Sequence, residues 1–148
     1  MNAAVVENEV EIRRSPEEVF DYTTDLTREH EWNPKTRRVD KLTEGQIGAG
    51  TRFEATFLKG DPMTIEVVRL ERPRVWESVG RSRRIEATTQ GTVTATHDGA
   101  RLTMRMELRP RHVPRALLPL LARYMHRQQE RNLNAIKALL EDSAFPDS

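Results

Sequence analysis

Apolar and polar residues alternate through much of the chain before residue 110, a pattern typical of β-strands with one buried face. A first such segment spans residues 5–13, and later ones are separated by turn residues. The later segments lie at 37–42, 51–58, 63–71, 74–79, 84–97 and 100–109. Adjoining apolar residues, Val68 and Leu70, break the alternation in the segment at 63–71, which predicts a β-bulge.

The last two predicted strands are joined by Asp98-Gly99, a dipeptide typical of a two-residue type I′ hairpin turn. Pairing outward from this turn brings mostly apolar residues together on one face. The predicted pairs are Ala95 with Leu102, Val93 with Met104, Gly91 with Met106 and Thr89 with Leu108. The opposite face carries only Thr, Arg and Glu, so we expect an antiparallel sheet covered on one side.

Helical segments are predicted on both sides of these strands. The run Ser-Pro-Glu-Glu at 15–18 supplies an N-cap, a proline at the first helical position and a capping glutamate, so a helix begins there. A second short turn at 26–31 ends at Trp32-Asn33-Pro34, because proline disfavours helix in the preceding residue. A long helix at about 113–142 is the expected cover of the sheet.

The apolar stripe of the long helix contains two amides. At about 100° per residue, Gln129 and Asn132 fall near the centre of the stripe, with Gln128 at its edge. A buried amide without a hydrogen-bond partner costs about 1–3 kcal/mol. We therefore expect this helix to cover polar groups, water or a cavity where something polar binds.

Composition and charge narrow the classes of function. The chain has 24 Lys plus Arg against 23 Asp plus Glu, so no net field attracts nucleic acid or an anionic membrane. It contains no Cys, which excludes disulfides, thiol catalysis and thiolate metal sites. Its 148 residues predict one domain over 1–148, with a loose tail at 143–148. No signal peptide or membrane span is visible, so we expect a cytoplasmic protein.

Two motifs with possible chemistry have simpler structural explanations. Gly48-Ala49-Gly50 resembles a phosphate loop, but a dinucleotide motif needs another glycine at 53, where this chain has Phe. The glycines are better explained as a turn into a strand. The four histidines lack metal-ligand spacing, so we expect no metal. His30 either lies on the surface or serves as a ligand contact or proton donor.

The order of elements is similar to that of the START-like (SRPBCC) helix-grip superfamily, in its polyketide cyclase/dehydrase and lipid-transport branch. The resemblance rests on SPEEVF at 15–20, WNP at 32–34, GAGTRF at 48–53 and RNL at 131–133 leading into KALLE at 137–141. It implies an α+β helix-grip fold, in which a curved antiparallel sheet wraps a long C-terminal helix and two short helices follow the first strand. It also implies a cavity between sheet and helix for an apolar or amphipathic ligand.

Nine residues are candidates to contact such a ligand. The tryptophans and methionines suit either a core or a pliable apolar pocket. The amides and the threonine among the candidates orient or polarise a carbonyl. The candidates are Trp32, Phe53, Trp76, Thr89, Met104, Met106, Met125, Gln129 and Asn132.

Three classes of function remain open. The first is binding of a lipid, isoprenoid or polyketide-like molecule; the second is a cofactor-independent cyclase or dehydratase acting on one; the third is a partner-binding domain. Catalysis needs an acid or base in the cavity with a tuned pKa, and the sequence places none there, so we rank binding first. We expect no cofactor, no nucleic acid, no stable membrane insertion, and a monomer or homodimer.

Overall fold

The computed structural model describes residues 3–142, so the tail expected at 143–148 lies outside the described residues. The strands are β1 (Ala4–Ile12), β2 (Thr36–Lys41), β3 (Arg52–Phe57), β4 (Met63–Glu71), β5 (Val75–Arg81), β6 (Ile85–Ala95) and β7 (Ala100–Pro110). The α-helices are α1 (Pro16–Thr24) and α2 (Leu118–Glu141), and the 3₁₀ helices are η1 (Leu26–Glu31) and η2 (Arg115–Leu117).

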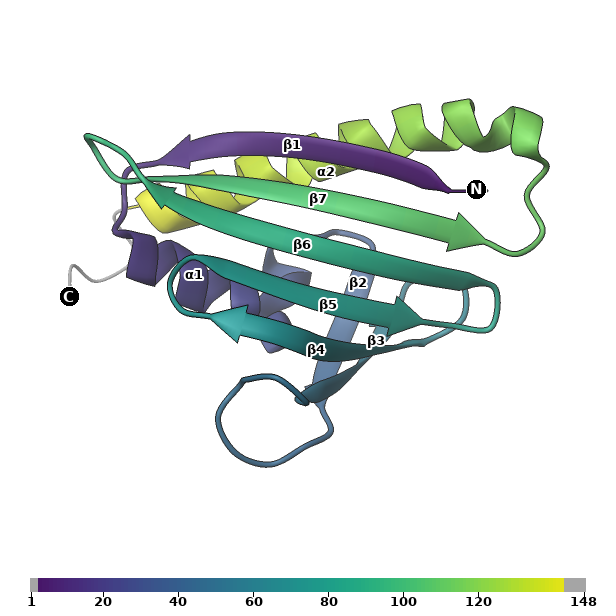
Figure 1. The fold of residues 1–148 in the computed structure, drawn as a ribbon, viewed down its shortest axis with the longest axis horizontal. Coiled ribbons are helices and arrows are strands. Elements are labelled where there is room, and N and C mark those ends of the chain that lie inside the picture. The colour runs from purple at the N-terminus through teal and green to yellow at the C-terminus, as the bar shows by residue number, and fades with distance from the viewer. Residues whose placement is uncertain (1–2, 143–148) are drawn as a thin grey trace.

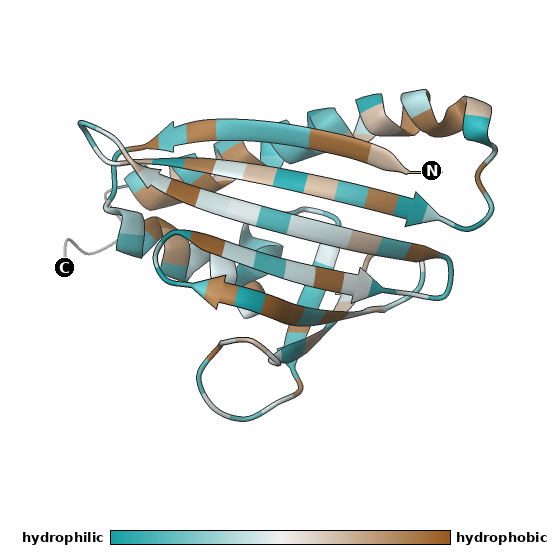
Figure 2. Ribbon diagram, viewed as in Figure 1, coloured by the Kyte–Doolittle hydropathy of each residue, from teal (hydrophilic) through white to brown (hydrophobic). Residues whose placement is uncertain are grey.

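The seven strands form one antiparallel sheet in the order β1-β7-β6-β5-β4-β3-β2. The helices lie on one side of this curved sheet, with α2 passing behind β1 and β7 (Figure 1). Apolar and polar positions alternate along several of the strands, because each strand has one covered and one open face (Figure 2). The predicted helix-grip fold is confirmed.

Local sequence signals explain where the first helices begin and where the sheet bends. Ser15 Oγ accepts a hydrogen bond from the Glu18 N–H at 3.2 Å, and Glu18 Oε1 accepts one from the Ser15 N–H at 3.3 Å. This is the predicted capping box, and it fixes the first turn of α1. The predicted bulge is also present, as a register shift between Val67 and Arg69 where β4 pairs with β5.

The predicted register of the β6–β7 hairpin is wrong by two residues. Ala95 pairs with Ala100 instead of Leu102, so residues 96–99 form the connection. Neither Asp98 nor Gly99 has a positive φ, which excludes a type I′ turn there. Because the error is an even number of residues, every side chain keeps its predicted face.

Gly99 is required for a different reason, which lies outside the hairpin. A Cβ at this position would lie 2.1 Å from the Ile12 carbonyl oxygen and 2.9 Å from the Arg13 Cα. The backbone that leaves β1 therefore passes directly against Gly99. The glycine that signals a tight turn in the sequence serves instead to let two segments approach closely.

The long helix begins later than predicted, at Leu118, after the short η2 turn. Pro119 lies in its first turn, where the missing N–H has no helical partner to lose. Leu118 is buried, whereas Leu117 and Leu120 remain exposed.

The apolar core divides into two clusters. One joins α1 and the C-terminal half of α2 to the sheet, and it includes Phe20, Leu102, Leu133 and Ile136, which are at most 1% exposed. The other lies over β2, β3 and β4 and is built from Val39, Phe53, Ala55, Ile65 and Val67.

Candidate functional site

A cavity of about 240 Å³ lies between the sheet, η1 and the part of α2 that precedes its packed C-terminal half. Its wall is mainly apolar. The apolar lining consists of Val6, Leu26, Trp32, Phe57, Met63, Ile65, Trp76, Ala87, Met104, Met106, Leu108 and Met125. The lining is completed by Gly80 and by the polar residues Thr23, Glu29, Asn33, Ser78, Thr89, Gln128, Gln129 and Asn132.

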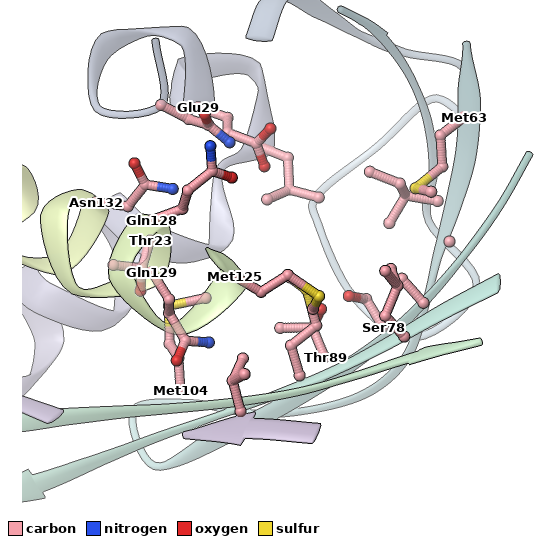
Figure 3. A pocket seen from close by; sticks show the side chains of 18 of the residues that line it. Thr23, Glu29, Met63, Ser78, Thr89, Met104, Met125, Gln128, Gln129 and Asn132 are labelled. Carbon is pink, nitrogen blue, oxygen red and sulfur yellow. The ribbon is translucent and has the colours of Figure 1, made fainter. Parts of the chain in front are cut away.

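The composition of α2 explains why the helix packs at one end and leaves space at the other. Leu133, Ile136 and Leu140 fill the core at its C-terminal half. One and two turns earlier, the same side of the helix presents Asn132, Gln129 and Met125 to the cavity (Figure 3). The amides predicted within the apolar stripe therefore mark the point where packing gives way to the cavity.

Trp76 forms part of the cavity wall, and the position of its indole depends on a glycine of the neighbouring strand. It pairs across β5 and β6 with Gly91, where a Cβ would come within 2.0 Å of the indole Cη2 atom. The absence of a side chain at Gly91 therefore lets the indole lie over β6. Phe20 supports the ring edge-on, with ring centroids 5.8 Å apart and planes 83° apart.

Gln129 is oriented by a polar residue on β1. Asn8 Nδ2 donates to Gln129 Oε1 at 2.9 Å and to the His126 carbonyl oxygen at 3.1 Å. Gln129 is only 7% exposed, and its Nε2 has no hydrogen-bond partner among the described residues. The amide of this cavity-lining residue thus has one satisfied end and one buried, unsatisfied donor.

Trp32 supplies a second buried donor of the same kind. It follows η1, in which residues three apart stack on one side, so Leu26, Glu29 and Trp32 all reach the cavity. Trp32 is 7% exposed, and its indole Nε1 has no hydrogen-bond partner within residues 3–142. Two residues that line the cavity therefore carry a buried donor without an acceptor in the described part of the chain.

Glu29 is an acid group in the cavity wall. Its Oε2 accepts a hydrogen bond from the Thr36 hydroxyl at 2.6 Å. Burial raises the pKa of Glu29 above its ordinary value, and the Thr36 bond offsets only part of that increase. Glu29 consequently holds its proton to a higher pH than an exposed glutamate.

The raised pKa of Glu29 predicts a pH-dependent effect of Glu29→Gln on stability. A carboxyl group whose pKa is higher in the folded than in the unfolded chain stabilises the fold when it is protonated. This stabilisation is complete when the pH lies below the ordinary pKa of 4.5. That stabilisation is lost as pH rises through the folded pKa. The melting temperature of Glu29→Gln should therefore rise relative to that of wild type as the pH is raised above 4.5.

The matched control for this experiment is Glu44→Gln, which changes an exposed glutamate outside the cavity. Its melting temperature should follow the wild-type pH profile. Parallel profiles for Glu29→Gln and wild type would contradict the raised pKa.

Comparison with known proteins assigns the chain to a family. A family model described as polyketide cyclase / dehydrase and lipid transport matches residues 3–141. The chain belongs to this family. No match was found among curated proteins.

Several solved structures share this fold at low sequence identity. A START superfamily protein from Mycobacterium smegmatis has a TM-score of 0.79 at 14% identity, covering 93% of this chain and 97% of its own. The di-domain ARO/CYC StfQ from the steffimycin biosynthetic pathway has a TM-score of 0.76 at 14% identity. The match covers 96% of this chain and 52% of the StfQ chain. A hypothetical protein, jhp0584, from Helicobacter pylori has a TM-score of 0.74 at 16% identity. The match covers 93% of this chain and 88% of the Helicobacter chain. The superfamily resemblance is confirmed.

Eight of the nine candidate contact residues line this cavity, and Phe53 does not. Phe53 is 0% exposed and packs in the core cluster over β2, β3 and β4, with Val39 and Ala55. It faces inward as expected, but the cavity reaches β3 only at Phe57, further along the same face. We therefore remove Phe53 from the candidate site.

The sequence interpretation missed Glu29 and Asn8. Glu29 shares the three-residue spacing of Leu26 and Trp32, and that spacing would have placed it on the inner side of a 3₁₀ helix. Asn8 interrupts the inward-facing series of β1, and its role is visible only once Gln129 lies opposite. The alternative contact His30 is exposed and lies outside the cavity wall.

Within residues 3–142, no cluster of three or more potential metal-ligating side chains is present. The described helices also include none that is both long and apolar enough to cross a membrane.

Proposed function

We propose that this protein binds an apolar or amphipathic small molecule, of the lipid, isoprenoid or polyketide-like kind, between the sheet and α2. The observation that carries the proposal is the cavity beside the part of α2 where amides replace core-filling leucines. Apolar pockets with a few converging polar groups are the usual form of small-molecule sites. Membership of the polyketide cyclase/dehydrase and lipid transport family supports the same function.

The direct test is titration with phenylnaphthylamine, an uncharged fluorescent molecule with no oxygen acceptor. We expect saturable binding with a blue-shifted emission, because the cavity wall is mainly apolar. Unlabelled apolar molecules should compete for the same site. The absence of saturable binding at the solubility limit of the probe would contradict the proposal.

The variant Asn132→Leu tests whether Asn132 contacts the ligand or stabilises the core. If Asn132 contacts the ligand, its loss removes one hydrogen bond to a carbonyl-bearing probe, about 1 kcal/mol or about fivefold in affinity. The melting temperature should change little, because Asn132 is only partly buried. A large change in melting temperature with unaltered probe affinity would instead show that Asn132 serves the fold.

A cyclase or dehydratase is the second candidate function, and Glu29 is the observation that favours it. A carboxyl whose pKa is raised by burial beside an apolar cavity is suited to general acid catalysis. In dehydration of a β-hydroxy ketone, it would donate a proton to the leaving hydroxyl, which departs as water. In the same step, the acidic α-proton beside the ketone would pass to the Glu29 carboxyl group as the C–O bond breaks and the double bond forms.

This second function is tested by following enone absorbance when a naphthyl β-hydroxy ketone is mixed with the protein. Catalysis by Glu29 predicts turnover by wild type and loss of turnover in Glu29→Gln. Equal rates for the two proteins would remove Glu29 as the acid.

A further inference from the structure

Two buried donors in the cavity wall specify the chemistry of the ligand, given that the cavity is the binding site proposed above. The orientation of the Gln129 amide follows from its neighbours. The His126 carbonyl oxygen can only accept, so the Asn8 atom 3.1 Å from it must be the NH₂ group. That same NH₂ group lies 2.9 Å from Gln129, which must therefore present its oxygen to Asn8.

The Gln129 NH₂ group is consequently directed away from Asn8, and it has no acceptor among the residues that the structure describes. The indole N–H of Trp32 can act only as a donor, and it is equally unpartnered. Leaving such buried groups unsatisfied carries a desolvation cost. A ligand with oxygen acceptors would recover that cost, whereas a pure hydrocarbon would not.

The charges around the cavity restrict the ligand further. None of the described residues that line it is Lys, Arg or His. The single ionisable side chain in the wall is Glu29, which is acidic. A carboxylate or phosphate in this space would lose its hydration without gaining a cation, and any ionised fraction of Glu29 would repel it.

We propose that the cavity selects an uncharged ligand with a carbonyl-type oxygen acceptor for Gln129 Nε2 and Trp32 Nε1, and discriminates against free carboxylic acids in their ionised form. The proposal places ketones, esters and amides ahead of fatty acid anions as ligands. It also gives Glu29 a second role, because its neutral form adds a donor to the cavity wall.

The proposal is tested with two fluorescent molecules that share one ring system. One is propionyl-dimethylaminonaphthalene, an uncharged ketone, and the other is dimethylaminonaphthalene carboxylate. At neutral pH the ketone should bind at least about tenfold more tightly, a difference of about 1.4 kcal/mol. Phenylnaphthylamine, which lacks an oxygen acceptor, reports on the cavity independently of the two donors.

Two substitutions remove one donor each. Trp32→Phe keeps an aromatic ring and loses the N–H, and Gln129→Met keeps the length of the side chain and loses the amide. Asn8 retains its bond to the His126 carbonyl in the second variant. Each should lower ketone affinity relative to phenylnaphthylamine affinity by about fivefold. The matched control Gln90→Met alters a glutamine of β6 outside the cavity wall and should leave this ratio unchanged.

The possible outcomes separate the two proposals. If phenylnaphthylamine binds but the ketone and carboxylate bind equally, the cavity is a site and the inferred selectivity is wrong. If both donor variants keep the wild-type affinity ratio, Gln129 and Trp32 do not recognise the ligand. If no probe binds, the function proposed for the cavity is overturned together with its selectivity.

Discussion

Replacing Thr89 by Trp is expected to abolish binding of phenylnaphthylamine. Thr89 projects into the cavity from β6 beside Ser78, its partner on β5 (Figure 3). An indole at this position would occupy much of the 240 Å³ space. Trp is well tolerated on half-buried strands, so the sheet should still form. The expected loss of affinity is more than about tenfold.

The matched control for Thr89→Trp is Thr88→Trp, which places the same side chain on the opposite face of β6. This control should bind the probe with wild-type affinity. Fluorescence titration of both variants, with circular dichroism to verify folding, makes the comparison. Unaltered binding by folded Thr89→Trp would show that the probe occupies another site.

Any side chain at position 99 is expected to destabilise the protein by about 3 kcal/mol. A Cβ there would meet the Ile12 carbonyl oxygen at 2.1 Å and the Arg14 nitrogen at 2.9 Å. Both contacts are to backbone, which cannot move aside as a flexible side chain can. Gly99→Ala and Gly99→Asn should therefore be similarly destabilising.

Gly99→Asn is the informative variant, because Asn is well accepted in a type I′ turn. Urea unfolding would measure both variants against Gly48→Ala, whose Cβ meets nothing within 4 Å and whose φ is not positive. A near-wild-type stability for Gly99→Asn would support the hairpin turn inferred from the sequence and contradict the close approach.

Features of the fold that depend on neighbouring residues were predictable from the sequence. The capping box at Ser15 and the 3₁₀ turn before Trp32 depend on residues within one turn, and both are present. The hairpin register failed because the need for Gly99 comes from the end of β1, which lies far from it in sequence.

The candidate site shows the same division between local and distant causes. Gln129 and Asn132 could be identified from the sequence because they are polar side chains within the apolar stripe of one helix. Phe53 and Phe57 share one face of β3, and the alternation alone could not show at which of them the core ends. The partial burial of Glu29 and its hydrogen bond with Thr36 arise only in the folded chain, so its raised pKa follows only from the folded structure.

The central claim, that an apolar small molecule occupies the space between sheet and α2, is tested most directly at the methionines. Met63, Met104, Met106 and Met125 line the cavity from two sides. With ¹³C-labelled methionine methyl groups, each assigned through its Leu variant, phenylnaphthylamine should shift all four resonances with one common dissociation constant. Saturating probe that leaves these four resonances unmoved would contradict the claim.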